Sequence, residues 1–226
     1  MIRLVLFDID GTLIQAGGAG GRAMERAWFE VFGVANGLAG VELGGRTDRS
    51  LFEELYRKHA VVHDAARHEV FELTFLHLLQ EYILSSRGTL LDGAIQLLRE
   101  LRAMESGVAI GLLTGNTRLA AEIKLRHFGI WEAFDLGAFG DDFACRNQLA
   151  GLARRRGESW LECSLGGEEI LVIGDTLHDI RCARSIGARC LAVSTGSVRF
   201  GQLRSEEPDY LVRDLGDFKV SQLLVD

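Results

Sequence analysis

Short apolar segments alternate along the chain with longer segments in which apolar residues recur every three or four positions. The apolar segments consist mainly of β-branched or other apolar residues and are each followed by small or acidic residues, and they cover residues 3–7, 108–113, 169–174 and 189–194, with a weaker example from residue 134 onward. Such runs are typical of buried parallel strands. Helical periodicity covers about 92–104, 117–128, 146–156 and 178–187. The alternation predicts an α/β fold, a doubly wound parallel sheet with helices on both faces.

The first two predicted strands are separated by an insertion. About 100 residues lie between them, whereas a simple crossover between parallel strands needs roughly 30. The insertion is helical in pattern, with Asp48 and Asp64 as candidate N-caps and with apolar stripes at Ala23, Ala27 and Val31, at Leu51 and Leu55, and at Phe71, Phe75, Leu78 and Leu79. We therefore expect two domains: an α/β core formed by residues 1–14 plus 87–226, and a small helical cap formed by residues 15–86.

Charge and cysteine usage limit the classes of partner. The 226 residues carry a formal net charge of −7, with basic and acidic residues mixed along the chain, which argues against nucleic acid or a membrane surface as the main partner. The four cysteines are far apart and form no C-x-x-C pair, a usage typical of reduced cytosolic thiols. The N-terminal apolar stretch is interrupted by Asp8, so we expect no signal peptide or membrane span and a cytoplasmic location.

Acidic residues gather where two of the predicted strands end. Asp8 and Asp10 follow the first strand, and residues two apart in an extended chain share a face. Asp175 and Asp179 follow the strand at 169–174, one helical turn apart. Carboxylates around one crevice suit a hard cation with oxygen ligands, and a site that also takes a phosphate favours Mg²⁺.

A candidate anion site follows the strand at 108–113. Thr114, Gly115 and Asn116 offer a hydroxyl and exposed backbone N–H groups where a helix should begin, an arrangement that favours phosphate. Arg146, at the start of a later helix, is the candidate cation for a phosphoryl oxygen. Arg46 lies in a predicted cap loop and is a candidate for substrate selection.

The order of these motifs, FDIDGT, then LLT, then a basic residue, then GDTLHD, resembles the haloacid dehalogenase superfamily over the whole chain. The resemblance is to its phosphatase branch with a helical cap of the first type, similar to phosphoglycolate phosphatase and β-phosphoglucomutase. It implies a Rossmann-like core, with Asp8 as nucleophile and Asp10 as general acid and base. It also implies metal binding by Asp8, Asp175, Asp179 and the backbone carbonyl of Asp10.

The resemblance further implies that Thr114 is the phosphate-binding hydroxyl and that Arg146 is the basic residue of the third motif. Many members of the superfamily carry Lys-Pro there, but the only proline of this chain is Pro208. Arg154 and Lys124 therefore stay open as alternatives. An acid at position 10 favours phosphoryl transfer, because the dehalogenases of the superfamily lack it.

The predicted function is a Mg²⁺-dependent phosphatase that hydrolyses a small phosphorylated metabolite through an aspartyl-phosphate on Asp8. Two alternatives stay open: a sugar phosphomutase with the same site, and a phospho-acceptor or binding module without turnover. The cap favours a small substrate, since a closed lid leaves little room for a polymer. The sequence does not decide between a monomer and a homodimer.

Overall fold

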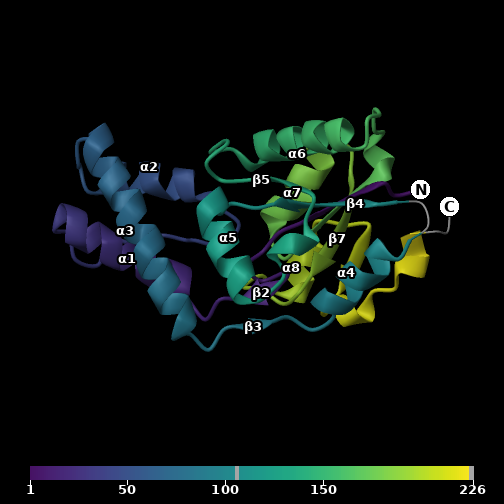
Figure 1. The fold of residues 1–226 in the computed structure, drawn as a ribbon, viewed down its shortest axis with the longest axis horizontal. Helices are drawn as coiled ribbons and strands as arrows, with labels where there is room; N and C mark the ends of the chain where they lie inside the picture. The colour runs from purple at the N-terminus through teal and green to yellow at the C-terminus, as the bar shows by residue number, and fades with distance from the viewer. Residues whose placement is uncertain (105–106, 224–226) are drawn as a thin grey trace.

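A six-stranded parallel sheet forms the centre of the protein (Figure 1). The structure, a computed structural model, describes residues 1–104 and 107–223. The strand order is β5-β4-β1-β6-β7-β8, and all five neighbouring pairs are parallel. The strands are β1 (Leu4–Phe7), β4 (Ala109–Leu113), β5 (Leu136–Ala138), β6 (Ile170–Gly174), β7 (Arg189–Val193) and β8 (Tyr210–Val212). The predicted doubly wound fold is confirmed, although the edge strand β8 was not among the predicted strands.

Helices bury both faces of this sheet. Successive strand residues point to opposite faces, so β1 places Val5 and Phe7 in one apolar cluster and Leu4 and Leu6 in another. Helices α4 (Ala94–Arg102) and α5 (Arg118–His127) contribute to the first cluster. The second cluster takes residues from α6 (Arg146–Trp160), α7 (Leu177–Ser185) and α8 (Phe200–Arg204). Burial on both sides explains why the strands are continuous apolar runs.

The insertion folds into three helices at one end of the molecule (Figure 1). Fully buried Trp28 packs edge-on against Tyr56 and Phe71, so an aromatic core joins the helices. The two connections to the sheet run side by side as a short antiparallel ladder, in which Ile14 pairs with Leu90. The boundaries are α1 (Ala19–Phe32), α2 (Asp48–Lys58) and α3 (Ala65–Leu84), with β2 (Ile14–Gln15) and β3 (Thr89–Leu90) as the ladder. The division at residues 15 and 87 stays a prediction.

Short 3-10 helices complete the described chain, at Trp131–Ala133, Gly167–Glu169, Leu215–Asp217 and Val220–Leu223. Across residues 1–104 and 107–223, no helix combines the length and apolar character that a membrane crossing needs.

One predicted helix cap is wrong. Thr47, not Asp48, is the N-cap of α2, and its side chain accepts a hydrogen bond from the Ser50 N–H at 3.1 Å. Asp48 is the first helical residue, and its carboxylate accepts the Thr117 N–H at 2.8 Å instead. The Asp48 carboxylate therefore bonds to the core domain, at the start of α5, rather than within its own helix. The other predicted cap, Asp64, is confirmed by its bond from the Arg67 N–H at 2.8 Å.

Candidate active site

The predicted site residues meet at the carboxyl end of the three central strands. Asp8 follows β1, Thr114 follows β4 and Asp175 follows β6, and β1 lies between the other two strands. The chain runs from β1 to β4 and β5 on one side of β1 and then crosses back to β6, β7 and β8 on the other side. Open parallel sheets bind ligands where the strand order reverses in this way.

The turn after β1 packs closely against Asp175. Gly11 has φ of 86°, and a Cβ there would lie 2.5 Å from an Asp175 carboxylate oxygen, so only glycine suits the position. The Thr12 hydroxyl donates to Asp175 Oδ1 at 3.3 Å. The turn thus holds Asp175 from β6 next to the segment that carries Asp8 and Asp10.

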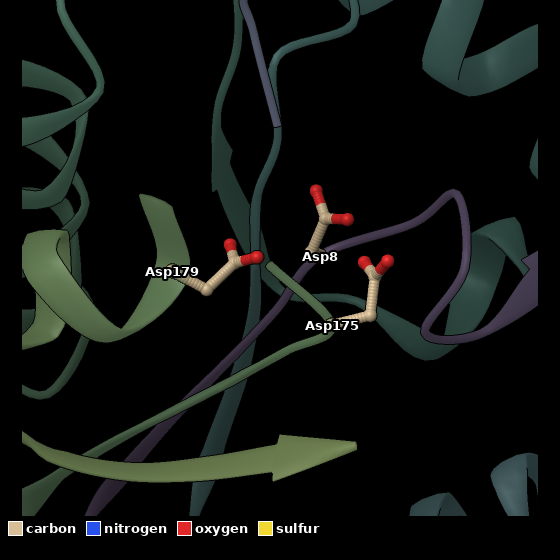
Figure 2. A group of neighbouring side chains, drawn as sticks. All are labelled: Asp8, Asp175 and Asp179. Carbon is tan, nitrogen blue, oxygen red and sulfur yellow. The ribbon is translucent and has the colours of Figure 1, made fainter. Parts of the chain in front are cut away.

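Three carboxylates converge at this edge (Figure 2). Asp8, Asp175 and Asp179 are buried, and one oxygen of each lies within 4.8 Å of the others. Asp179 is oriented by the start of α7, where its Oδ2 accepts the Thr176 N–H at 3.0 Å and the Thr176 hydroxyl at 2.6 Å. The predicted grouping of acids from two strand ends is therefore present, without the side chain of Asp10.

Arg146 lies against this cluster. It is the first residue of α6 and is buried. Its Nη2 donates to Asp8 Oδ1 at 2.8 Å, to Asp179 Oδ1 at 2.5 Å and to the Leu113 carbonyl at 3.2 Å. The guanidinium thereby bridges two of the three acids and fixes the rotamer of Asp8.

One cation does not balance this cluster. Burial raises the pKa of Asp8 to about 6, although Arg146 opposes the shift. Burial, together with the neighbouring charges of Asp8 and Asp179, raises the pKa of Asp175 to about 8. A further cation beside these buried carboxyls would favour their ionised forms and lower the raised pKa values. Their hard oxygen donors fit a divalent cation such as Mg²⁺.

Asp10 belongs to a second network beside this cluster. Asn116 Nδ2 donates to Asp10 Oδ2 at 2.8 Å and to Thr114 Oγ1 at 2.9 Å. Lys124, on α5, donates from Nζ to Asp10 Oδ2 at 2.6 Å. The predicted anion-site residues Thr114 and Asn116 are thus linked to the predicted acid and base. The Gly115 carbonyl accepts the Asp48 N–H of the cap at 2.7 Å.

The three candidates for the basic third-motif residue lie in different places. Arg146 contacts Asp8 and Lys124 contacts Asp10. Arg154 pairs with Glu158 at 3.1 Å and does not line the cavity between the sheet edge and the cap. The sequence pattern gave no sign of the Lys124–Asp10 contact, because a helix position 114 residues away carries no motif.

A cavity of about 290 Å³ lies between the sheet edge and the cap. The core lines it with Asp8, Asp10 and Arg146, and the cap contributes mostly small and apolar residues, together with Asp48. Arg46 also lines it, but its guanidinium pairs with Glu54 and donates to the Ser50 carbonyl at 3.1 Å. Its role in substrate selection stays a prediction.

Residues 2–187 match the model of a protein family, the haloacid dehalogenase-like hydrolases. The chain belongs to this family. The chain is similar to the phosphoglycolate phosphatase of Yersinia pseudotuberculosis serotype I (strain IP32953), which is 26% identical over 96% of this chain and 91% of that protein. The expected resemblance to the phosphatase branch of the family is confirmed.

Solved structures show the same fold. A predicted phosphoglycolate phosphatase from Haemophilus somnus 129pt has a TM-score of 0.73 at 19% identity, with 99% of this chain and 98% of that chain covered. CbbY from Rhodobacter sphaeroides, solved in complex with phosphate, has a TM-score of 0.71 at 20% identity, with all of both chains covered. At 19% and 20% identity, these similarities are evidence for the fold alone of this haloacid dehalogenase-like hydrolase.

Proposed function

We propose that this hydrolase is a Mg²⁺-dependent phosphatase that cleaves a small-metabolite phosphomonoester through an aspartyl-phosphate on Asp8. The observation that carries the proposal is the cluster around Asp8, in which three buried carboxylates converge and Arg146 donates to the nucleophile candidate at 2.8 Å. A nucleophile for a phosphoryl group needs positive charge beside it, because it must approach an anion.

In the first step, a carboxylate oxygen of Asp8 attacks phosphorus while the bond to the leaving oxygen breaks. Arg146 is placed to offset the charge of the phosphoryl oxygens. Thr114 Oγ1, at the end of β4 and buried, would donate to another phosphoryl oxygen. Its hydroxyl proton is available for this, because the Asn116 backbone and side-chain N–H groups donate to the same oxygen.

Asp10 would serve both halves of the reaction. Its side chain is 42% exposed and lines the cavity. As an acid it gives a proton to the departing alkoxide, and as a base it takes one from the water that attacks the phosphoryl group on Asp8. Asp8 is then free again.

Three side chains would hold the metal: Asp8, Asp175 and Asp179, together with the backbone carbonyl of Asp10 as the family resemblance implies. When bound, Mg²⁺ supplies positive charge that offsets the buried carboxylates and the phosphoryl oxygens. The Arg146 bridge between Asp8 and Asp179 already holds two of these side chains on one side of the site.

The size of the cavity supports a small substrate. About 290 Å³ suits a metabolite rather than a polymer, and the name of the Yersinia relative makes 2-phosphoglycolate the first compound to test. We further propose a cytoplasmic location, in keeping with cysteines that are all unpaired.

The test is phosphate release from p-nitrophenyl phosphate, 2-phosphoglycolate and a panel of sugar phosphates, with Mg²⁺ or with EDTA. We expect Mg²⁺-dependent turnover that Asp8→Asn abolishes and that the exposed control Asp217→Asn retains. No turnover by the wild-type protein on any of these compounds would contradict the proposal. Conversion of one sugar phosphate isomer into another without phosphate release would instead establish the mutase alternative.

A further inference from the structure

Lys124 is a buried cation on the inner face of α5, where helical periodicity predicts an apolar residue. Its neighbours on the inner face of α5 are Ala120, Ala121 and Leu125, all fully buried. The lysine side chain is 6% exposed, whereas Lys58 and Lys219, the other two lysines of the chain, are exposed. Burial of an ammonium group costs free energy unless charged or polar partners compensate it. The groups to which Lys124 donates hydrogen bonds therefore indicate the function of its ammonium group.

Those groups belong to Asp10, the candidate acid and base, and to Asn116, which itself donates a hydrogen bond to Asp10. Lys124 Nζ donates to Asp10 Oδ2 at 2.6 Å and to Asn116 Oδ1 at 2.6 Å. Asn116 in turn donates from Nδ2 to the same oxygen of Asp10 at 2.8 Å. The three side chains form a closed triangle of hydrogen bonds, and each bond fixes the orientation of the other two.

The triangle distinguishes the two oxygens of Asp10. Both donors bind Oδ2, and this leaves Oδ1 as the oxygen that can carry a proton toward the cavity, because a doubly hydrogen-bonded acceptor has no room for a proton of its own. We propose that Lys124 is a positioning residue of the phosphatase, which holds Asp10 by Oδ2 so that Oδ1 exchanges the proton with the leaving group and the attacking water. The proposal rests on the proposed function, since it requires Asp10 as acid and base.

The cap leaves space for this lysine. A side-chain carbon at Gly20, in the first turn of α1, would lie 3.5 Å from Lys124 Nζ. The ammonium group thus lies at the boundary between α5 and the cap, and Lys124, Asp10 and Asn116 all line the cavity. Arg146 contacts the nucleophile candidate from α6, so Asp8 and Asp10 each pair with a cation from a different helix.

The test compares two leaving groups. An alkoxide must receive a proton as it departs, whereas p-nitrophenolate departs without one, so a residue that acts through Asp10 affects the two substrates differently. For Lys124→Met we expect kcat/KM on an alkyl phosphomonoester, 2-phosphoglycolate, to fall about 100-fold, the typical loss for a catalytic group displaced by about 1 Å. On p-nitrophenyl phosphate we expect kcat/KM within about threefold of wild type, because kcat/KM reports the transfer to Asp8 and not the later attack of water, which is common to both substrates. Lys219→Met, on the surface, is the matched control.

A double-mutant cycle with Asp10→Asn identifies the residue through which Lys124 acts. In the Asp10→Asn background, Lys124→Met should cost less than about threefold on 2-phosphoglycolate, because the group it positions is already inactive. Additive losses, or equal losses of kcat/KM on both substrates in the single variant, would overturn the positioning role while leaving the phosphatase proposal intact. If Lys124→Met does not fold, as judged by circular dichroism, Lys124→Gln replaces it and the same criteria apply. If the wild type turns over neither substrate, the proposed function itself fails, and the positioning role with it.

Discussion

Asp48 allows a quantitative prediction of how stability depends on pH. Its carboxyl is 8% exposed and lies between α2 and the start of α5. Burial raises its pKa from 3.8 to about 6, against the opposing effects of Lys124 and the Thr117 N–H. The folded protein therefore binds this proton more tightly than the unfolded chain does. The stabilisation is fully present below pH 3.8 and is lost as the pH rises through about 6.

The magnitude follows from the shift. A difference of roughly 2 pKa units corresponds to about 3 kcal/mol, of which linkage assigns about 2 kcal/mol to the range from pH 4.5 to pH 8. Asp48→Asn removes the titration but keeps the shape, and its amide oxygen can still accept the Thr117 N–H. The free energy of unfolding of the variant, relative to wild type, should therefore rise by about 2 kcal/mol between these two pH values.

The assay is urea unfolding followed by circular dichroism, for both proteins, in EDTA at pH 4.5 and at pH 8. The titration of Asp8 and Asp175 is common to the two proteins and cancels in the difference. A difference in unfolding free energy that stays constant to within about 0.5 kcal/mol between the two pH values would refute the reasoning, because it would mean that Asp48 ionises as easily in the folded protein as in the unfolded chain.

Two further predictions concern the cap and the metal. A Cβ at Gly115 would clash with the Arg46 carbonyl oxygen, so Gly115→Ala should hold the cap away from the sheet and lower kcat/KM at least about tenfold. Gly201→Ala, with open space around its Cβ, is the control. A wild-type value of kcat/KM in Gly115→Ala would contradict the prediction. Because the pKa of Asp175 is raised to about 8, Mg²⁺ binding should release protons and tighten as the pH rises from 6 to 8. Calorimetry in two buffers of different ionisation enthalpy measures this release, and binding without it would contradict the assignment.

The sequence predicted the fold and the identity of the grouped acids because both depend on local pattern. Apolar runs that are followed by small or acidic residues identify parallel strands, and parallel strands place the residues that follow them at one edge of the sheet. Asp8, Thr114 and Asp175 could therefore be placed together without coordinates. The strand β8 was missed because its three residues are only half-buried and lie at the sheet edge, where the apolar pattern is weakest.

Contacts between distant helices could not be predicted. Lys124 was noted only as a substitute for Arg146, since helical periodicity shows that a residue faces inward but not what it meets there. Asp48 illustrates the same limit: its type and position suit a helix cap, yet its carboxylate bonds to a backbone N–H of the core at 2.8 Å. Such pairings depend on how the cap packs on α5, and the local sequence pattern does not show that packing.

Direct capture of the phosphoryl group on Asp8 tests the central claim. The protein would be mixed with 2-phosphoglycolate and Mg²⁺, quenched, and reduced with borohydride, which converts an aspartyl-phosphate into homoserine. Peptide mass spectrometry would then locate the modified residue. The account predicts homoserine at position 8 only when both substrate and Mg²⁺ are present. Phosphate release with no modification at Asp8, or with modification of a different residue, would contradict it.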